Sequence, residues 1–549
     1  SLGGAIGVLL SGFLLIGLVG LPGTITAAGM VNVLLATFVW VLARNHPVAA
    51  GEATAAGRQG EGTWYRLLLV AALVTGAASF MYEIAWIRML SMVLGSTTHA
   101  FELMLSAFIF GLAFGGLWIR RRIRHIADPV FFTAIVQLAM GVLALASLAI
   151  YGKTFQVMHG ALEVLTRSDS GYMLFNLTSH ALTLLVMLPA TFCAGMTLPL
   201  MTFALFRKGY GEQSIGSIYA ANTVGAILGV ALSIHVLITL VGVKGLVITG
   251  AALDIVLGVV LIGMTVSQRD KSLLFRAAGV GTIALLIAIF GVHLDPAKMA
   301  SGVYRHGRVA LPADHRILFH RDGKTASISL YENPAGTRFI STNGKPDASI
   351  QMSGGEPVAD EMTMALAAAL PIAHHPQART VANIGMGSGL TTHTLLTMPD
   401  IELVDTVEIE SAMVEGAKGF RPRVERAFSD PRSRIHIEDA KTYFSTHDRQ
   451  YDLIVSEPSN PWVSGVASLF TSEFYRGITR YLADDGLFVQ WLQIYEIDTS
   501  LVASVIMALS EWFDDYAIYN TDSANILILA RKDGKLGSPD DGIFNIPEL

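Results

Sequence analysis

The order of hydrophobic and polar positions divides the chain into two parts of different character. Residues 1–295 form a series of apolar runs, each close to the roughly 20 residues that an α-helix needs to cross a bilayer. From about residue 297 the apolar runs are short and alternate with polar positions, as in half-buried strands. The pattern therefore predicts a polytopic helical membrane domain over 1–296, followed by a domain of mixed α/β structure.

About nine membrane spans are predicted in the first part. They cover residues 2–21, 23–43, 66–87, 98–119, 129–150, 173–200, 215–240, 243–266 and 273–293. Polar residues inside or beside these spans are Glu83, Arg88, Glu102, His180, Asn222, His235 and Asp254. They can pair with neighbours while small-residue patterns such as Gly111-x-x-x-Gly115 pack the helices closely, or Glu83, Glu102 and Asp254 can line a cation path. We favour packing, because no ion-site motif accompanies them.

An internal repeat appears within the apolar part. Residues 3–23 resemble residues 225–245 in register, and the matching pairs are Gly3/Gly225, Gly7/Gly229, Val8/Val230, Ser11/Ser233, Val19/Val241, Gly20/Gly242 and Gly23/Gly245. Two copies of a helix pair indicate a duplicated membrane unit, as in many transporter folds. The spans over 66–200 have no counterpart before residue 1, so we expect that an upstream half exists and that Ser1 is not the natural start.

The second part predicts a small β cap followed by a parallel sheet. Residues 325–331 and 337–342 alternate as strands, and Asn343-Gly344 is a tight-turn signal, so the cap covers 297–345. A helix over 357–370 follows. Further strands are expected at 380–384, 403–410, 433–439, 451–456, 486–491 and 525–530, with a short helix over 390–398. This alternation predicts a Rossmann-like α/β domain of the class I methyltransferase type over 346–549.

A glycine-rich turn after the first of these strands predicts nucleotide binding. The run Gly385-Met-Gly-Ser-Gly389 lets backbone approach a ligand, so Gly385, Gly387, Ser388 and Gly389 are candidate cofactor residues. Glu408 ends the next strand, where an acid binds ribose hydroxyls, and Asp439 ends the third, where it can accept a hydrogen bond from an adenine amino group. Glycines also make ordinary turns, but the flanking strands and the acid favour the nucleotide site.

Glu457 is the candidate catalytic residue. It ends the fourth strand within Glu457-Pro-Ser-Asn-Pro-Trp462, and the prolines hold the segment rigid and leave few backbone donors. A partly desolvated carboxylate there has a raised pKa and suits general-base work on an amine. The alternative is an acid that caps a helix or fixes the loop. Residues assigned to the substrate are Asn460, Gln490, Trp491 and Tyr495.

Composition supports a membrane domain and reduces the classes of ligand that we expect. The 549 residues are 52% hydrophobic and 15% charged with a mean hydropathy of +0.51, which is too apolar for an ordinary soluble protein. The net charge of −6 and the pI near 6.2 give no reason to expect a nucleic-acid partner. A single cysteine, Cys193, excludes an internal disulfide framework and a cysteine-based zinc site, and we expect no metal.

Basic loops predict the orientation of the spans but conflict with the span count. Residues 120–124, Arg207, Lys208, Arg269, Lys271 and Arg276 fall on one side, which should be cytoplasmic. If 273–293 also crosses, the second part of the chain lies on the opposite side. A nucleotide-using domain is expected where its cofactor is made. We therefore expect a multi-pass protein of a bacterial-type plasma (inner) membrane with a cytoplasmic α/β domain. The number of predicted spans, taken with the basic loops, predicts the opposite side for that domain.

Several motifs in order resemble one known family. Gly385-Met-Gly-Ser-Gly389, Val407-Glu-Ile-Glu410, Glu438-Asp-Ala440, the run from Tyr451 to Pro461, Leu469-Phe470 and Phe474-Tyr475 look like the spermidine synthase family of polyamine aminopropyltransferases. The β cap resembles that family's amino-terminal strands. With its membrane region, the chain resembles membrane-fused spermidine synthase-like proteins, whose spans are often compared with major facilitator transporters.

The resemblance implies aminopropyl transfer from decarboxylated S-adenosylmethionine to a primary amine such as putrescine, with release of methylthioadenosine. The family's ribose-binding acid falls on Glu408, its adenine-side acid on Asp439 and its base on Glu457. Two positions depart from the family: Ser388 stands where soluble synthases have an acid, and Asn460 stands where their second active-site acid would be. The tyrosine-rich substrate segment has no clear match around Asp360-Glu361.

Three classes of function follow. The first is a membrane-anchored aminopropyltransferase that makes a spermidine-like polyamine from a small-molecule amine. The second is a methyltransferase that uses intact S-adenosylmethionine, because the same fold binds that cofactor and fewer acids suit a less cationic acceptor. The third is a transport or scaffold protein with a degenerate synthase domain. The expected partners are the lipid bilayer and either a second copy of the chain or another membrane protein.

Overall fold

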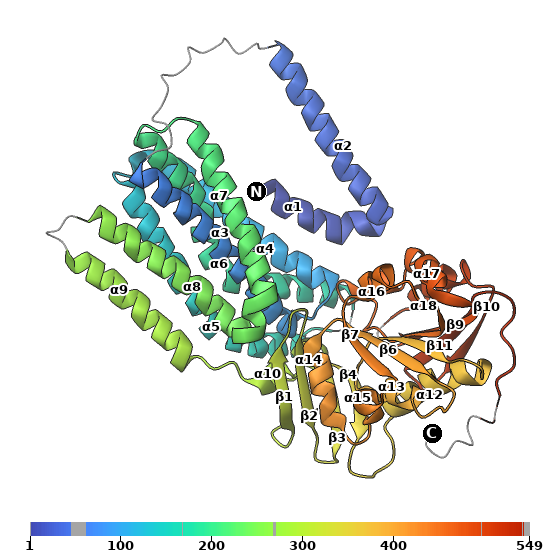
Figure 1. Cartoon of the computed structure of the whole chain (residues 1–549). Helices are drawn as coiled ribbons and strands as arrows, with labels where there is room; N and C mark the ends of the chain where they lie inside the picture. The colour runs from blue at the N-terminus through green and yellow to red at the C-terminus, as the bar shows by residue number, and fades with distance from the viewer. Residues whose placement is uncertain are drawn as a thin grey trace. The chain divides into compact units, whose positions relative to one another are not determined.

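The protein folds into two compact units, Ser1–Asp295 and Pro296–Leu549 (Figure 1). This computed structural model describes residues 2–45, 62–166, 168–266, 271–495, 497–540 and 542. The first unit is helical. The second holds two β-sheets and the helices that cover them.

The helical unit consists of long apolar helices. They are α1 (Leu2–Leu10), α2 (Ile16–Asn45), α3 (Thr63–Leu94), α4 (Thr98–Arg122), α5 (Pro129–Val164), α6 (Asp169–Arg207), α7 (Gln213–Leu232), α8 (Ile238–Thr265) and α9 (Lys271–Leu286). Short π-helical turns join α1 to α2 at Ser11–Leu15 and α7 to α8 at Ser233–Leu237, and another extends α9 at Ile287–Gly291. Counted as continuous helices, seven of those described are long and apolar enough to cross a membrane, by length and composition.

Two boundaries predicted between spans lie close to glycines whose non-helical backbone separates two helical segments. Gly20 has φ 68° and ψ 177°, and Gly242 has φ 68° and ψ −179°. Residues with a side chain are almost never found in this backbone region. The two glycines occupy equivalent positions of the sequence repeat, and each follows a π-helical turn. The repeated sequences therefore adopt the same series of local shapes.

Small residues let the helices of this unit approach closely, as predicted for the Gly111-x-x-x-Gly115 pattern. A Cβ placed on Gly115 would lie 2.0 Å from the carbonyl oxygen of Phe192, and one on Gly195 would lie 2.2 Å from that of Leu112. Backbones of α4 and α6 therefore touch, which only glycine permits at these positions. The same is true of Gly225 in α7, whose added Cβ would lie 1.9 Å from the carbonyl oxygen of Leu73 in α3.

The second unit begins with α10 (Pro296–Met299) and α11 (Val303–His306), followed by a four-stranded antiparallel sheet. Its strands run in the order β1 (Arg316–Asp322), β2 (Ser327–Glu332), β3 (Thr337–Thr342) and β4 (Lys345–Gln351). Asn343 and Gly344 turn the chain between β3 and β4 with φ of 49° and 81°, as the tight-turn signal predicted. The small sheet therefore continues through β4 to Gln351, beyond the boundary of 345 that the sequence suggested.

A seven-stranded sheet follows, in the order β10-β11-β9-β8-β5-β6-β7. Its strands are β5 (Thr380–Ile384), β6 (Leu403–Glu408), β7 (Ser433–Ile437), β8 (Tyr451–Ser456), β9 (Leu482–Gln493), β10 (Asp515–Asn520) and β11 (Asn525–Arg531). The first five are mutually parallel, whereas β11 is antiparallel to β9 and β10 is antiparallel to β11. All six strands predicted for this domain are present, and β10 was not predicted.

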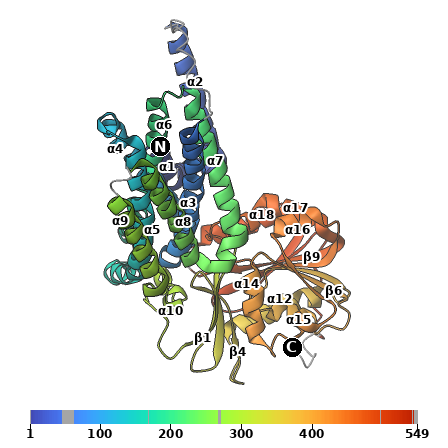
Figure 2. The same ribbon diagram turned by 60° about the vertical axis from the view of Figure 1, so that its left-hand side comes forward.

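Helices cover both faces of this sheet (Figure 2). One face packs on α16 (Ala440–Thr446), α17 (Ser472–Ile478) and α18 (Thr499–Ser510), around buried Phe488 and Tyr475. The other packs on α12 (Ala359–His374) and α13 (Leu390–Leu395), around Val455 and Leu487. Of two further short helices, α14 (Ser411–Ala417) lies against the small sheet, and α15 (Arg426–Ser429) packs on α13 and β7. With both faces covered, the carboxyl edge of the parallel strands is the part of the sheet open to a ligand.

Candidate active site at the carboxyl edge of the parallel sheet

The strand order reverses at β5, which is the point where α/β sheets of this kind bind ligands. From β5 the chain continues to β6 on one side, and β8 lies on the other. The glycine turn after β5 and the segment after β8 meet here. The amide of Glu457 donates to the carbonyl of Ile384 at 2.9 Å, and the amide of Gly385 donates to that of Val407 at 2.9 Å. A Cβ on Gly385 would lie 2.6 Å from the carbonyl oxygen of Glu457, so the close approach requires glycine.

Glu408 holds the glycine turn in place from the end of β6. Its Oε2 accepts a hydrogen bond from the amide of Met386 at 2.9 Å, and its Oε1 accepts one from the amide of Glu410 at 2.9 Å. The residue is 8% exposed. Burial raises the pKa of Glu408 to about 7, although the two amide donors act in the opposite direction. Each oxygen keeps a lone pair that can accept from a ligand hydroxyl.

Glu457 combines burial with unused hydrogen-bonding capacity. Its Oε2 accepts from the hydroxyl of Thr391 at 3.0 Å. Its Oε1 is shielded from water and has no partner among the described residues. Burial raises the pKa of Glu457 to about 7, and the Thr391 hydroxyl partly offsets the rise. A carboxyl with such a pKa exchanges its proton easily near neutral pH, which is what a general base requires.

Two predicted cofactor residues have local structural roles. The Ser388 side chain is fully buried, and its hydroxyl donates to Sδ of Met364 at 3.1 Å and accepts from the amide of Leu390 at 3.3 Å. It therefore offers a ligand only its backbone. Asp439 is exposed at the start of α16, where its Oδ1 accepts from the amide of Thr442 at 3.0 Å. This is a helix cap that leaves Oδ2 available to a ligand.

The residues predicted to contact the substrate do not all lie together. Gln490 and Trp491 are neighbours inside β9, so their side chains point to opposite faces of the sheet. Gln490 accepts from the Tyr475 hydroxyl at 3.3 Å and donates to the carbonyl of Ser456 at 3.3 Å. Trp491 donates to Oδ1 of Asn525 at 3.1 Å on the other face. The Tyr495 ring lies 5.0 Å below the guanidinium of Arg305.

Two buried amides at this end of the sheet have spare donors and acceptors. Asn460 and Gln493 are both 0% exposed, and neither amide group has a partner among the described residues. Buried polar groups are normally hydrogen-bonded, so these two are available to a bound molecule. Gln493 was missed by sequence reasoning because the predicted strand ended at 491, whereas β9 continues to Gln493.

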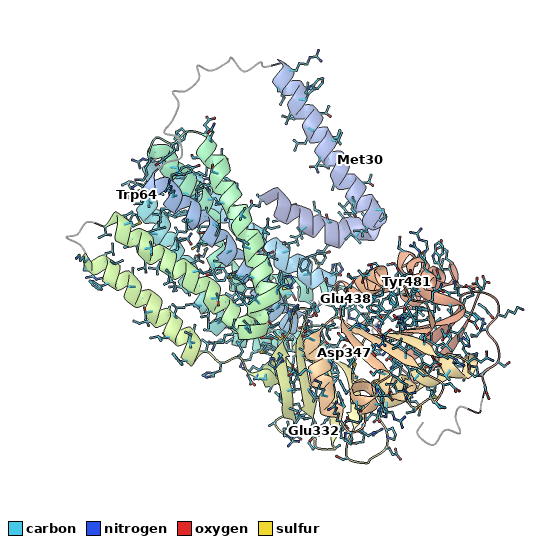
Figure 3. All side chains as sticks on the ribbon, viewed as in Figure 1. Met30, Trp64, Glu332, Asp347, Glu438 and Tyr481 are labelled. Atoms are coloured by element: carbon cyan, nitrogen blue, oxygen red, sulfur yellow. The ribbon has the colours of Figure 1, made fainter. Side chains whose placement is uncertain are left out.

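Sequence reasoning also missed a lysine and an acid of the small sheet. Lys345, 7% exposed, donates from Nζ to Oδ1 of Asp347 at 2.9 Å and to the hydroxyl of Ser459 at 3.2 Å (Figure 3 labels Asp347). Asp347 adjoins the glycine turn: a Cβ on Gly387 would lie 3.7 Å from Cβ of Ala348. Its negative charge also raises the pKa of Glu408. Asp347 was missed because the predicted cap stopped at 345, although the turn at Asn343-Gly344 implied a returning strand.

Asp360 extends the acidic side of the site. It lies in the first turn of α12, where burial raises its pKa and the negative charge of Asp522 adds to the rise. The ammonium of Lys345 and the Ser349 hydroxyl act in the opposite direction. The structure therefore gathers carboxyls that are distant in sequence around the glycine turn. Across the described residues, no group of three His, Cys, Asp or Glu side chains could hold a metal ion.

Comparison with known proteins shows that part of the second unit matches a known domain family. Residues 362–523 match the family described as spermine/spermidine synthase domain. The second unit contains a spermidine synthase domain. The match confirms the resemblance that the motifs predicted and supports an enzyme.

Individual proteins that are similar to this chain have names related to that of the family. Polyamine aminopropyltransferase 1 of Streptomyces coelicolor is 25% identical over 428 residues, which cover 76% of this chain and 74% of the relative. This match is longer than the second unit, so it extends into the helical unit. A polyamine aminopropyltransferase of Moorella thermoacetica is 30% identical over 28% of this chain and 53% of its own length. The spermidine synthase of Thermotoga maritima is similar in structure, with 22% identity, a TM-score of 0.35 and coverage of 40% of this chain and 73% of its own.

Proposed function

We propose that this protein transfers an aminopropyl group from decarboxylated S-adenosylmethionine to a primary amine of the putrescine type. The products are a spermidine-like polyamine and methylthioadenosine. The amine nitrogen attacks the carbon bonded to the sulfonium sulfur, the carbon–sulfur bond breaks with its electron pair going to sulfur, and the amine loses a proton to Glu457. The relatives named above are polyamine aminopropyltransferases, which supports this choice of reaction.

The observation that carries the proposal is the position of the Glu457 carboxyl. It follows β8 at the point where the glycine turn comes closest, and its Oε1 is shielded and without a partner among the described residues. A donor bound over the glycine turn, with its ribose on Glu408 and its adenine near Asp439, would present its sulfonium beside this carboxyl. Because the sulfonium carbon is already electrophilic, aligning the amine and removing its proton is the main work of catalysis.

The acceptor side favours a small amine that makes hydrogen bonds as well as ion pairs. Asn460 and Gln493 provide neutral amides, while Asp347 and Asp360 provide negative charge near the glycine turn. Asn460 stands where an acid would bind a cationic tail in the resembling family. We therefore infer that Asp347 and Asp360 contribute the attraction for cationic groups that this position lacks.

We propose that the helical unit anchors the enzyme in a bacterial-type plasma (inner) membrane as a multi-pass protein. Seven of its described helices have the required length and apolar character, and the match to the Streptomyces coelicolor relative extends into this unit. We place the synthase domain in the cytoplasm, where its nucleotide donor is made. Cysteine-accessibility labelling with membrane-impermeant reagents from each side would decide the orientation.

The decisive experiment uses the full chain in detergent or nanodiscs. Calorimetric titration with decarboxylated S-adenosylmethionine, followed by mass spectrometry of the reaction with putrescine, should give tight binding and a product heavier by one aminopropyl group. Glu457→Gln should bind the donor and make no product. The matched control is Glu473→Gln, an exposed acid in the first turn of α17, which should keep full activity. Absence of donor binding to the wild-type protein would contradict the proposal.

A second candidate is methyl transfer from intact S-adenosylmethionine. The observation that favours it is Lys345, a buried cation near the glycine turn. Intact S-adenosylmethionine has a carboxylate that the decarboxylated form lacks, and this carboxylate could pair with Lys345. The same titration separates the two reactions. Preference for intact S-adenosylmethionine, with a methylated product, would replace aminopropyl transfer.

A further inference from the structure

The helical unit buries a carboxyl that the proposed chemistry does not use. Asp254 of α8 is 0% exposed. Its Oδ2 accepts a hydrogen bond from the Tyr82 hydroxyl of α3 at 2.6 Å. Its Oδ1 is buried and has no partner among the described residues. A carboxylate in such surroundings is strongly disfavoured unless a cation or several donors accompany it. The phenol is its one hydrogen-bond donor in the described part of the chain.

Asp254 lies within a row of buried polar groups that runs along α3 and α5. Its members pair by hydrogen bonds, as follows: Gln137 with the Thr75 hydroxyl, Trp86 with the Ser147 hydroxyl at 2.9 Å, and Tyr151 with the carbonyl of Met89 at 2.8 Å. All of these side chains are buried. Their nearly constant separation in sequence shows that α3 and α5 run side by side in the same direction. Tyr82 and Asp254 stand in the middle of this row.

The space around Asp254 admits only a small ligand. A Cβ on Gly141 of α5 would lie 2.8 Å from the carbonyl oxygen of Ala251 and 3.4 Å from Cβ of Asp254. A Cβ on Gly250 would lie 2.8 Å from the Tyr82 ring. The glycines therefore allow α3, α5 and α8 to close tightly around the carboxyl. Such packing favours a proton over a polyamine or a hydrated cation.

Other ionisable groups around Asp254 are few in the described residues. From α6, Cys193 interacts electrostatically with it. From α3, Tyr82 donates the hydrogen bond, and the neighbouring Glu83 lies about 100° around the helix from Tyr82, so it faces another direction. From α5, the facing residue is Gly141, which has no side chain.

We propose that Asp254 is a proton-binding site inside the helical unit, with Tyr82 as the group that stabilises its ionised form. In the neutral form the proton resides on Oδ1 and the phenol donates to Oδ2. On ionisation the Oδ1–H bond breaks, the proton passes to water, and the phenol hydrogen bond remains with the carboxylate. Because no basic side chain contacts Asp254 among the described residues, its ionised form carries uncompensated charge. The proton is therefore the ligand that this site takes, a function separate from aminopropyl transfer.

Infrared difference spectroscopy between pH values detects the carbonyl stretch of a protonated carboxyl without a bulky reagent, so it tests this site in the full chain in detergent. The band that Asp254→Asn removes should be present at neutral pH, and its amplitude should fall about tenfold per pH unit once the pH exceeds the pKa of the carboxyl. Tyr82→Phe removes the donor that favours the ionised form, so the band should persist to higher pH. Glu83→Gln should leave the profile of Asp254 unchanged.

Two results would overturn the proposal. No protonated-carboxyl band that depends on Asp254 at neutral pH, while the wild-type protein is folded, would mean that the carboxyl is not protonated. A band that stays constant across the whole pH range would mean that its proton does not exchange and that the Tyr82 contact is purely structural. Both results are read from the wild-type chain, and Asp254→Asn serves to assign the band.

Discussion

Both units bury carboxyl groups, but they satisfy them by different means. In the synthase domain, Glu408 receives two backbone amides from Met386 and Glu410, at the edge where the strands end. In the helical unit, Asp254 receives one side-chain hydroxyl, from Tyr82. The difference follows from the backbone. Turns after parallel strands have amides free to bind an acid, whereas the amides inside a helix already bind carbonyls of the preceding turn. An acid in a helical bundle therefore depends on side chains.

The position of a carboxyl also decides what it can do. Glu457 and Glu408 lie where a substrate can reach them, at the carboxyl edge of the sheet. Asp254 lies between helices that glycines bring into close contact. Glu457 and Glu408 are therefore suited to contact a ligand, whereas Asp254, which is similarly buried, is suited to bind only a proton. The predictions below test this contrast, starting with the largest expected effect.

Replacing Glu457 by Gln should lower kcat by about a hundredfold to ten-thousandfold, the range for loss of a general base. Affinity for the donor should stay within about threefold of the wild type, since the amide keeps the shape of the side chain and its contact with Thr391. Stopped-flow or quenched turnover with calorimetric donor binding measures both. A parallel loss of binding and turnover would instead give Glu457 a binding role.

Glu408→Gln should weaken donor binding by about tenfold to a hundredfold. The amide nitrogen of Gln cannot accept a hydrogen bond, so one of the two backbone donors would lose its acceptor at a cost of about 1–3 kcal/mol, and the glycine turn would shift. Calorimetry measures the affinity. Glu402→Gln is the control, because Glu402 is an exposed partner of Arg379. Equal effects of the two variants would remove Glu408 from the site.

The rate should depend on pH through Glu457, whose pKa burial raises to about 7. The ionised form accepts the proton, so kcat should rise about tenfold per unit at pH values below about 7 and level off above it. Initial rates across a pH series measure this limb, and the residual activity of Glu457→Gln should lack it. A glutamate with an ordinary pKa would already be ionised at about pH 6. A wild-type profile that is flat below about pH 6 would therefore contradict the assignment.

The raised pKa of Glu457 also makes the stability of the folded protein depend on pH. In the folded protein Glu457 holds its proton to about pH 7, above its ordinary value of 4.5, so the folded state binds more protons than the unfolded state between these values. The contribution of this carboxyl to the free energy of unfolding should therefore fall as pH rises through that window. Thermal unfolding of Glu457→Gln should show a smaller fall than the wild type does.

Asp347→Asn should weaken binding of decarboxylated S-adenosylmethionine by about tenfold, because it removes a negative charge near the glycine turn and leaves the Lys345 ammonium unneutralised. Glu332→Gln is the control on the same small sheet (Figure 3 labels Glu332). Glu332 pairs with Arg316 and Arg338. Calorimetry with both donors also tests the second candidate reaction. If methyl transfer is correct, this variant should instead gain affinity for intact S-adenosylmethionine.

The smallest effect is expected in the helical unit. Tyr82→Phe should lower the free energy of unfolding by about 1–3 kcal/mol, since the buried Asp254 loses its donor. Tyr65→Phe breaks a hydrogen bond to the neutral hydroxyl of Ser217 and should cost about 0.5–1.5 kcal/mol. Thermal unfolding in detergent, followed by helical circular dichroism, compares the two. A loss for Tyr65→Phe that exceeds the loss for Tyr82→Phe would contradict the contrast between the units.

The sequence allowed much of the fold to be predicted because its periodicities are strong. The strands over 380–384 and 451–456 were predicted with the boundaries that β5 and β8 have. Apolar runs located the helices, and the two breaks predicted between spans lie close to Gly20 and Gly242, where non-helical backbone separates two helical segments. Hydropathy measures how apolar a segment is and does not identify the glycine conformation that makes the break.

The candidate site was predictable where a motif is continuous in the chain. The glycine turn, Glu408 and Glu457 follow directly after strands, so their placement at one edge follows from parallel pairing. Lys345, Asp347 and Gln493 belong to strand ends whose extent depends on pairing with distant segments, and they were missed. Gln490 and Trp491 are adjacent in β9 and lie on opposite faces of the sheet, which the alternation of side chains in a strand already implied.

By itself the sequence determined the two-part architecture, the order of strands and helices along the chain and the acids that follow the strands, since hydrophobic periodicity and turn chemistry are local. Only the tertiary structure decided which carboxyls are buried and which partners they have. Glu457 gained its raised pKa, and Asp254 its single phenol, from residues far away in the chain. Desolvation and hydrogen bonding depend on the atoms that packing brings together, and these are not neighbours in sequence.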